Sequence, residues 1–137
     1  MTDKKFHLEI RSDPNNLIIV EEFVHYFGKE LGLDDEQLSG LLLAVTEATT
    51  NAIIHGNKKD PAKKVEIDAE LINKQLIVRI KDEGKGFDPA KIPDPTEPEN
   101  ILKDSGRGLY LIRVYMDDLS YKITPSGLET ILTLNLS

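Results

Sequence analysis

EATTNAIIHGN, residues 47–57, is the stretch of sequence that decides the fold. It continues a helical repeat of apolar residues and stops at Gly56 and Asn57, which are typical of a helix C-terminus. Upstream, Asp34 can cap the start of this helix, and Gln37 is spaced to complete a capping box. The buried stripe of the helix is predicted to consist of Leu38, Leu41, Leu42, Val45, Ala48, Ala52 and Ile53.

The same stretch carries polar residues at every fourth position. Glu47, Asn51 and His55 therefore share one face of the helix. Carboxylate and amide oxygens are ligands that Mg²⁺ accepts, with phosphate oxygens and water completing its shell, and a carboxylate can also deprotonate a hydroxyl. The alternative is an ordinary solvated helix face, with His55 as a charge complement to the helix C-terminus.

A glycine-rich turn, DEGKGFDP, follows at residues 82–89. Asp82 comes directly after an apolar strand, so its carboxylate lies at the end of that strand. Glycine allows close approach of the backbone to a ligand, and a carboxylate there can accept a hydrogen bond from an exocyclic amine such as that of adenine. Taken alone, the motif is equally typical of a tight turn.

A second glycine motif, SGRGL at residues 105–109, precedes a predicted helix. Backbone N–H groups of Gly106, Arg107 and Gly108 can face a phosphate at such a place, and the Arg107 side chain can add positive charge. The spacing fits neither the Walker pattern nor the dinucleotide-binding fingerprint. A short Gly-x-Gly sequence is common in proteins, so it indicates a phosphate-binding loop only in combination with the other two stretches.

The remaining elements are predicted from the apolar pattern. A strand at residues 6–10 precedes a helix that starts near residues 12–14 and ends near Gly32. Strands are expected at residues 65–71, 76–80, 119–124 and 128–136, and a helix at residues 108–116. Residues 88–104 hold four of the seven prolines and are either a lid over a site or a plain surface connection. This order predicts one domain over residues 1–137, of class α+β: a two-layer sandwich with a mostly antiparallel sheet and helices on one face.

Composition limits the classes of function. The chain has 137 residues, 39% of them hydrophobic, and no cysteine, which suits one globular domain in a reducing compartment. The net charge of −7 argues against binding to a nucleic-acid backbone. The apolar runs are too short to span a membrane, and the N-terminus does not read as a signal peptide.

In this order the three stretches resemble the motifs of the GHKL ATPase superfamily, which includes gyrase, Hsp90, histidine kinases and MutL. Residues 47–56 resemble its N box, residues 82–86 its G1 box and residues 106–108 its G2 box. The runs NAIIHGN and DEGKGFDP are most similar to those of the anti-sigma factor serine kinases of the RsbW and SpoIIAB type. The resemblance extends from Phe6 to Leu136 and implies the Bergerat ATP-binding fold.

The resemblance also implies roles for individual residues. ATP would lie between the second helix and the lid, with Asn51 on Mg²⁺ and Glu47 as general base. Asp82 would read the adenine amino group, and Gly84 and Gly86 would make room for the base. The other nucleotide-binding positions implied are Phe87, Gly106, Arg107, Gly108 and Leu109, with the glycines of the second motif at the phosphates.

The activity implied is transfer of the γ-phosphoryl group of ATP to a serine of a STAS-domain anti-anti-sigma protein. Such a protein would be a cytoplasmic homodimer that sequesters a sigma factor and regulates transcription in a bacterial partner-switching circuit, without touching nucleic acid or membrane. The alternative within the same fold is a non-catalytic module whose partner affinity responds to ATP. A purely structural interaction domain is a third hypothesis, and it predicts no nucleotide site.

Overall fold

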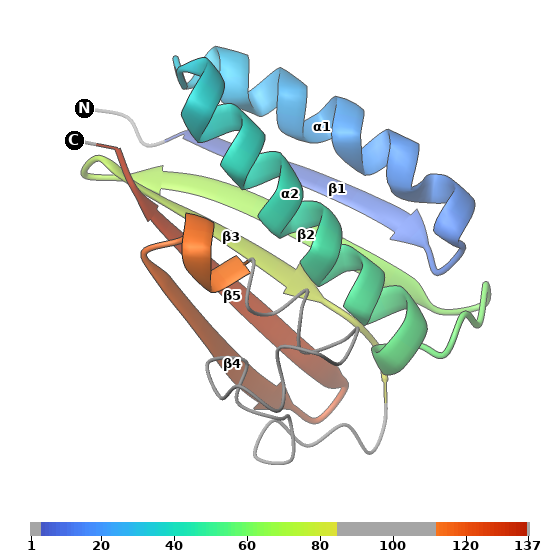
Figure 1. Cartoon of the computed structure of the whole chain (residues 1–137). Helices are drawn as coiled ribbons and strands as arrows, with labels where there is room; N and C mark the ends of the chain where they lie inside the picture. The colour runs from blue at the N-terminus through green and yellow to red at the C-terminus, as the bar shows by residue number, and fades with distance from the viewer. Residues whose placement is uncertain (1–3, 85–111, 137) are drawn as a thin grey trace.

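A computed structural model describes residues 4–84 and 112–136 (Figure 1). The helices are α1 (Leu17–Glu30) and α2 (Asp35–Asn51), and α2 is continued by a π-helical turn, Ala52–Gly56. The strands are β1 (Lys4–Arg11), β2 (Lys64–Ile72), β3 (Gln75–Lys81), β4 (Asp118–Thr124) and β5 (Gly127–Asn135). In the described residues they form a five-stranded sheet of order β1-β2-β3-β5-β4, and every neighbouring pair is antiparallel.

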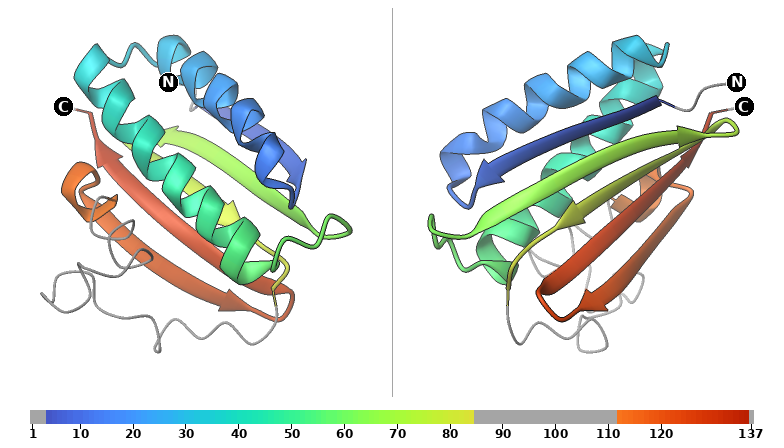
Figure 2. Two further views of the ribbon diagram at one scale, coloured as in Figure 1. Left: turned by 45° about the vertical axis from the view of Figure 1, so that its right-hand side comes forward. Right: turned by 180° about the vertical axis from the view of Figure 1, so that it is seen from behind.

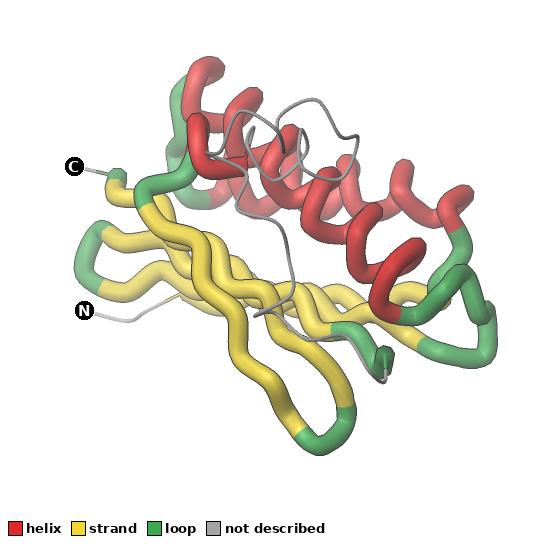
Figure 3. Tube along the Cα trace, turned by 60° about the horizontal axis from the view of Figure 1, so that its bottom comes forward, coloured by secondary structure: helices red, strands yellow, loops and turns green. Residues whose placement is uncertain are grey.

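The molecule has two layers. Helices α1 and α2 lie together on one face of the sheet (Figure 3). Seen from behind, the opposite face of the sheet is not covered by any helix of the described residues (Figure 2). This arrangement confirms the predicted α+β class, the antiparallel sheet and the placement of the helices on one face.

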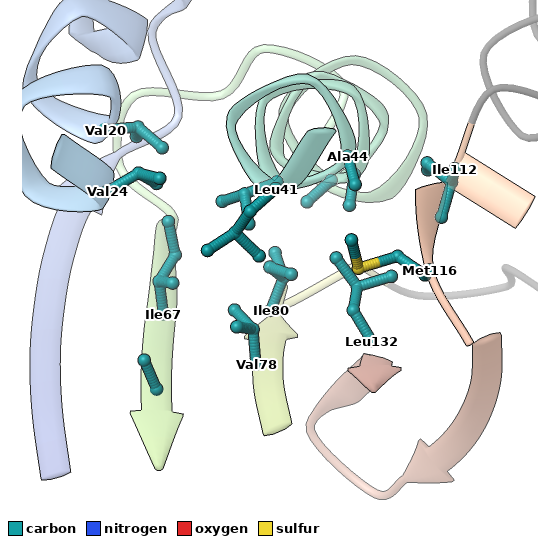
Figure 4. Close-up of a cluster of buried hydrophobic side chains, with 14 of the residues drawn as sticks. Val20, Val24, Leu41, Ala44, Ile67, Val78, Ile80, Ile112, Met116 and Leu132 are labelled. Atoms are coloured by element: carbon teal, nitrogen blue, oxygen red, sulfur yellow. The ribbon is translucent and has the colours of Figure 1, made fainter. Parts of the chain in front are cut away.

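The hydrophobic core fills the space between the two layers (Figure 4). The predicted stripe of α2 supplies much of it: Leu41, Val45 and Ile53 are fully buried, whereas Leu38 and Leu42 are half-buried. Alternate residues of the strands face these helices, as period-two patterns require. The other fully buried large side chains are Val20, Val24, Phe27, Val65, Ile67, Leu76, Ile80, Ile112 and Leu132.

The helix starts follow the predicted capping chemistry. Asp34 Oδ1 accepts a hydrogen bond from Gln37 N at 2.8 Å, and Gln37 Oε1 accepts one from Asp34 N at 3.1 Å, which confirms the capping box. Asp13 caps a short 3-10 turn, Pro14–Asn16, that leads into α1. Gly32 follows the end of α1 with a φ of +74°, a conformation that glycine adopts without strain.

The strand boundaries differ from the predictions by a few residues at most. The β2–β3 hairpin turns at Asn73 and Lys74, where φ is +49° and +65°. The β4–β5 hairpin turns at residues 125 and 126, because Thr124 already pairs with Gly127. Residues 112–115 are helical, as expected, but the start of that helix and the proline-rich segment 88–104 lie outside the described residues.

The open face of the sheet carries charged side chains of both signs. Lys64 Nζ lies 3.2 Å from Glu9 and 3.3 Å from Glu66, while Arg79 contacts Glu70 at 3.3 Å and Glu129 at 3.6 Å. These pairs are partly exposed, so each adds little to stability, but they keep this face polar.

Within residues 4–84 and 112–136, no helix is long and apolar enough to cross a membrane.

Candidate functional site

One wall of the candidate site is the C-terminal end of α2. Glu47 and Asn51 lie one turn apart there and both are partly exposed, so their side chains are accessible from solvent.

The sequence predicted a regular helix to Gly56, but the α-helix ends at Asn51 and the last turn is a π-helix. In that turn Asn57 N donates to Ala52 O at 2.8 Å, a bond across five residues. Single π-helical turns occur often at functional sites.

Asp82 lies immediately after β3, as predicted, and is only 3% exposed. Its Oδ1 accepts hydrogen bonds from the backbone N–H groups of Gly84 at 2.9 Å and Leu128 at 3.2 Å. Its own N–H donates to Leu128 O at 3.0 Å, so Asp82 both donates a hydrogen bond to Leu128 of β5 and accepts one from it. Its Oδ2 makes no hydrogen bond with any residue in the described parts of the chain.

The environment of Asp82 opposes its ionisation. Burial raises the pKa of this carboxyl above its ordinary value of 3.8. The N–H groups of Gly84 and Leu128 and the positive charge of Lys63 act in the opposite direction and do not cancel the effect of burial. A buried carboxylate oxygen that accepts no hydrogen bond from the described residues gains from a ligand that brings a donor, such as an amine.

The helix end and the strand end are packed directly against each other. A Cβ atom on Gly56 would collide with Oδ2 of Asp82, and a Cβ atom on Gly84 would collide with the carbonyl oxygen of Gly56. Gly127 is also required, because its Cβ would overlap the carbonyl oxygen of Asp82. The fold thus brings the N-box and G1-box stretches together. Gly84 makes room for protein backbone, and its expected role beside the base stays a prediction.

Asn57 is a site residue whose role the sequence did not reveal, since it reads there as a helix stop. Its side chain is fully buried and hydrogen-bonds to Ser12 Oγ at 2.5 Å, Lys64 O at 2.9 Å and Glu83 N at 2.7 Å. Ser12 and Glu83 are far away in the sequence and Lys64 belongs to the next strand, so no helix or turn pattern indicates these contacts. His55, by contrast, is exposed on the π-helical turn.

The other predicted site residues lie outside the described residues: Gly86, Phe87, Gly106, Arg107, Gly108 and Leu109. The roles predicted for Glu47 and Asn51 as base and Mg²⁺ ligand also remain predictions. No cluster of three or more His, Cys, Asp or Glu side chains in residues 4–84 and 112–136 is placed to hold a metal ion. The amide oxygen of Asn51 fits Mg²⁺ that takes most of its ligands from phosphate and water.

Residues 10–134 match the model of the histidine kinase-like ATPase domain family. The chain is 34% identical to an anti-sigma F factor of Clostridium botulinum over 87% of this chain and 85% of that protein. It is 34% identical to the anti-sigma F factor of Bacillus subtilis over 97% of this chain and 93% of that protein. A serine-protein kinase RsbW of Oceanobacillus iheyensis is 33% identical over 65% of this chain and 60% of its own length.

Solved structures support the same fold. The RsbU and RsbW domains of a Mycobacterium tuberculosis protein superpose with a TM-score of 0.72 and 17% identity, over 97% of this chain and 32% of that one. The histidine kinase domain of a blue-light activated kinase from Erythrobacter litoralis has a TM-score of 0.58 and 17% identity, over 93% of this chain and 62% of that one. At this identity the likeness concerns the fold.

Proposed function

The chain belongs to the histidine kinase-like ATPase domain family, and we propose that it is an ATP-dependent serine-protein kinase that acts as an anti-sigma factor. The observation that carries the proposal is the direct packing of Asp82 against Gly56. This contact places the carboxylate proposed to bind adenine beside the end of the helix that bears Glu47 and Asn51. The names of the anti-sigma F and RsbW relatives support the kinase and anti-sigma roles.

The proposed nucleotide position follows from the chemistry of the two walls. Oδ2 of Asp82 is the acceptor for the adenine amino group, since Oδ1 already accepts two backbone N–H groups. From there the phosphates extend along the exposed side of α2 towards Asn51, and Gly106, Arg107 and Gly108 bind them. Mg²⁺, when bound through Asn51, would neutralise phosphate charge.

In the proposed reaction, the serine hydroxyl of the partner attacks the γ-phosphorus of ATP. The bond from the γ-phosphorus to the β,γ-bridging oxygen breaks, ADP leaves with that oxygen, and the serine proton passes to the Glu47 carboxylate. Glu47 is partly exposed and one helical turn from Asn51, which allows a protein substrate to reach it beside the phosphates. Phosphoryl transfer depends mainly on such positioning and on charge neutralisation.

The proposed partners are a sigma factor, which the chain sequesters in the cytoplasm, and a STAS-domain anti-anti-sigma protein, whose serine it phosphorylates. We also propose that the chain works as a homodimer. The sigma-factor partner is supported by the names of the anti-sigma relatives. Light scattering on the purified protein, alone and mixed with each partner, measures the mass of each complex.

Nucleotide binding is the first test. Titration calorimetry of the wild type with ATP and Mg²⁺ should show binding, and Asn51→Ala should lose the dependence on Mg²⁺. Leu76→Ala, at the opposite end of β3 from Asp82, is a control for general destabilisation and should keep that dependence. If the wild type binds no ATP in the presence of Mg²⁺, the proposed function is wrong.

A further inference from the structure

Asn57 is a fully buried polar side chain for which the proposed reaction has no use. Its Oδ1 accepts a hydrogen bond from the backbone N–H of Glu83, and its Nδ2 donates to the carbonyl of Lys64. Because one partner is a backbone donor and the other a backbone acceptor, the orientation of the Asn57 amide is fixed. The Nδ2 group also donates to Ser12 Oγ at 2.5 Å.

These contacts form a closed ring. Asn57 Nδ2 donates to Lys64 O at 2.9 Å, Lys64 N donates to Glu83 Oε1 at 2.7 Å, and Glu83 N donates to Asn57 Oδ1 at 2.7 Å. Glu83 is thus held through both its backbone and its side chain. The ring links the end of the π-helical turn, the start of β2 and the residue that follows Asp82.

The ring adjoins the Asp82 carboxylate at two points, through Glu83 and through Asn57. Asp82 Oδ1 accepts from Gly84 N, so Glu83 is the central residue of the short turn that orients this side chain. On the other side, Gly56 precedes Asn57 and lies against Asp82 Oδ2. A shift of Asn57 therefore moves both the backbone that carries Asp82 and the backbone that Asp82 packs against.

We propose that Asn57 is a positioning residue for Asp82 and so determines how strongly the site selects the 6-amino group of adenine. This inference rests on the proposed nucleotide site. Asn57 acts through Glu83 and Gly56 and does not touch the nucleotide itself. Its φ of −90° and ψ of −4° are those of the third residue of a type I turn, which alanine can adopt, so Asn57→Ala acts through the lost side chain.

The test compares ATP with purine riboside triphosphate, which carries the same phosphates but lacks the 6-amino group. The ratio of the two dissociation constants reports recognition of that amino group, and a merely structural role would not change it. Asn57→Ala should lower the preference for ATP by about tenfold, the equivalent of one misplaced hydrogen bond. Affinity for purine riboside triphosphate should change much less.

Two further variants make the result decisive. Ser12→Ala removes one acceptor of the Asn57 amide and leaves the ring itself intact, so it should lower the preference by a smaller factor. Leu76→Ala, which destabilises the far end of β3, should leave the preference unchanged. Circular dichroism at the temperature of titration checks that each variant is folded. If Asn57→Ala is unfolded, the preference of Ser12→Ala for ATP tests the positioning role in its place.

The outcomes separate this inference from the function on which it rests. A wild type that prefers ATP, together with folded Asn57→Ala and Ser12→Ala that keep the full preference, overturns the positioning role and leaves the proposed function standing. A fall of the same size in Leu76→Ala also overturns it, because the effect would then be general destabilisation. A wild type that binds neither nucleotide overturns the proposed function and this inference together.

Discussion

Gly56 and Asp82 are in such close contact that a single methyl group on the Cα of Gly56 would collide with Oδ2 of the carboxylate. This contact joins the end of the π-helical turn to the end of β3. It fixes the position of Oδ2 of Asp82, for which the described residues provide no hydrogen-bond donor.

The first prediction follows from this contact. Gly56→Ala should destabilise the protein by about 1–3 kcal/mol, as is usual for overpacking, and should weaken ATP binding because Asp82 has to move. Thermal unfolding and titration calorimetry measure the two effects. Gly28→Ala in α1 is the matched control: its methyl group would meet the end of the flexible Leu38 side chain, which can shift. Equal ATP affinity in Gly56→Ala and wild type would contradict the prediction.

The second prediction concerns the charge of Asp82. Because burial raises the pKa of this carboxyl above 3.8, its charge, and with it the hydrogen bond to the adenine amino group, should be lost as the pH falls through the raised value. The preference for ATP over purine riboside triphosphate should therefore decline at acidic pH. Asp82→Asn keeps an oxygen for the N–H groups of Gly84 and Leu128 but lacks the second acceptor, so its preference should be low at every pH.

The same pKa shift has a consequence for stability. Between pH 3.8 and the raised pKa, the folded protein holds a proton that the unfolded chain has released, so the free energy of unfolding should fall as the pH rises through this window. Asp82→Asn should remove this part of the pH dependence. Urea unfolding of both proteins across the acidic range measures it, and identical pH profiles would contradict the assigned shift.

The third prediction tests the β2–β3 hairpin, which is remote from the site. Lys74 occupies the second turn position with a φ of +65°, where glycine is preferred. Lys74→Gly should raise the free energy of unfolding by about 0.5 kcal/mol, the relief of strain being offset in part by greater freedom of the unfolded chain. The matched control is Lys122→Gly on β4, which should be destabilising because glycine weakens a strand. Destabilisation by Lys74→Gly as well would contradict the prediction.

Much of the fold could be predicted because the signals that specify it are local. The period-two pattern around Val78 and Leu132 and the capping box of Asp34 with Gln37 each depend on residues close together in the sequence. The placement of Asp82 at a strand end followed from the apolar run before it. These predictions were correct because local preference and tertiary packing agree at those positions.

The site itself could be predicted only in part. The π-helical turn was missed because its apolar residues fit an ordinary helix equally well, and the bond from Asn57 N to Ala52 O is visible only in three dimensions. The ring through Asn57, Lys64 and Glu83 joins residues from separate elements, and their spacing in the sequence carries no information about it. Gly84 was assigned to the nucleotide, yet the backbone of Gly56 alone already requires a glycine there.

The fourth prediction concerns the reaction. Glu47→Gln should bind ATP with the wild-type affinity, since the substitution keeps size and polarity, but phosphoryl transfer should fall by about 10²–10⁴-fold through loss of the general base. Thr46→Ser, the neighbouring polar residue on α2, is a control that should retain transfer. A Glu47→Gln variant with full activity would show that another group accepts the proton.

The most direct measurement of the central claim is transfer of labelled γ-phosphate from ATP to a purified STAS-domain protein of the same genome. We expect the wild type, with Mg²⁺, to form phosphoserine on that protein and Glu47→Gln, under conditions in which it binds ATP, to form very little. A wild type that binds ATP but labels no STAS-domain protein of that genome would contradict the kinase assignment and favour a module that uses ATP only to set its affinity for a partner.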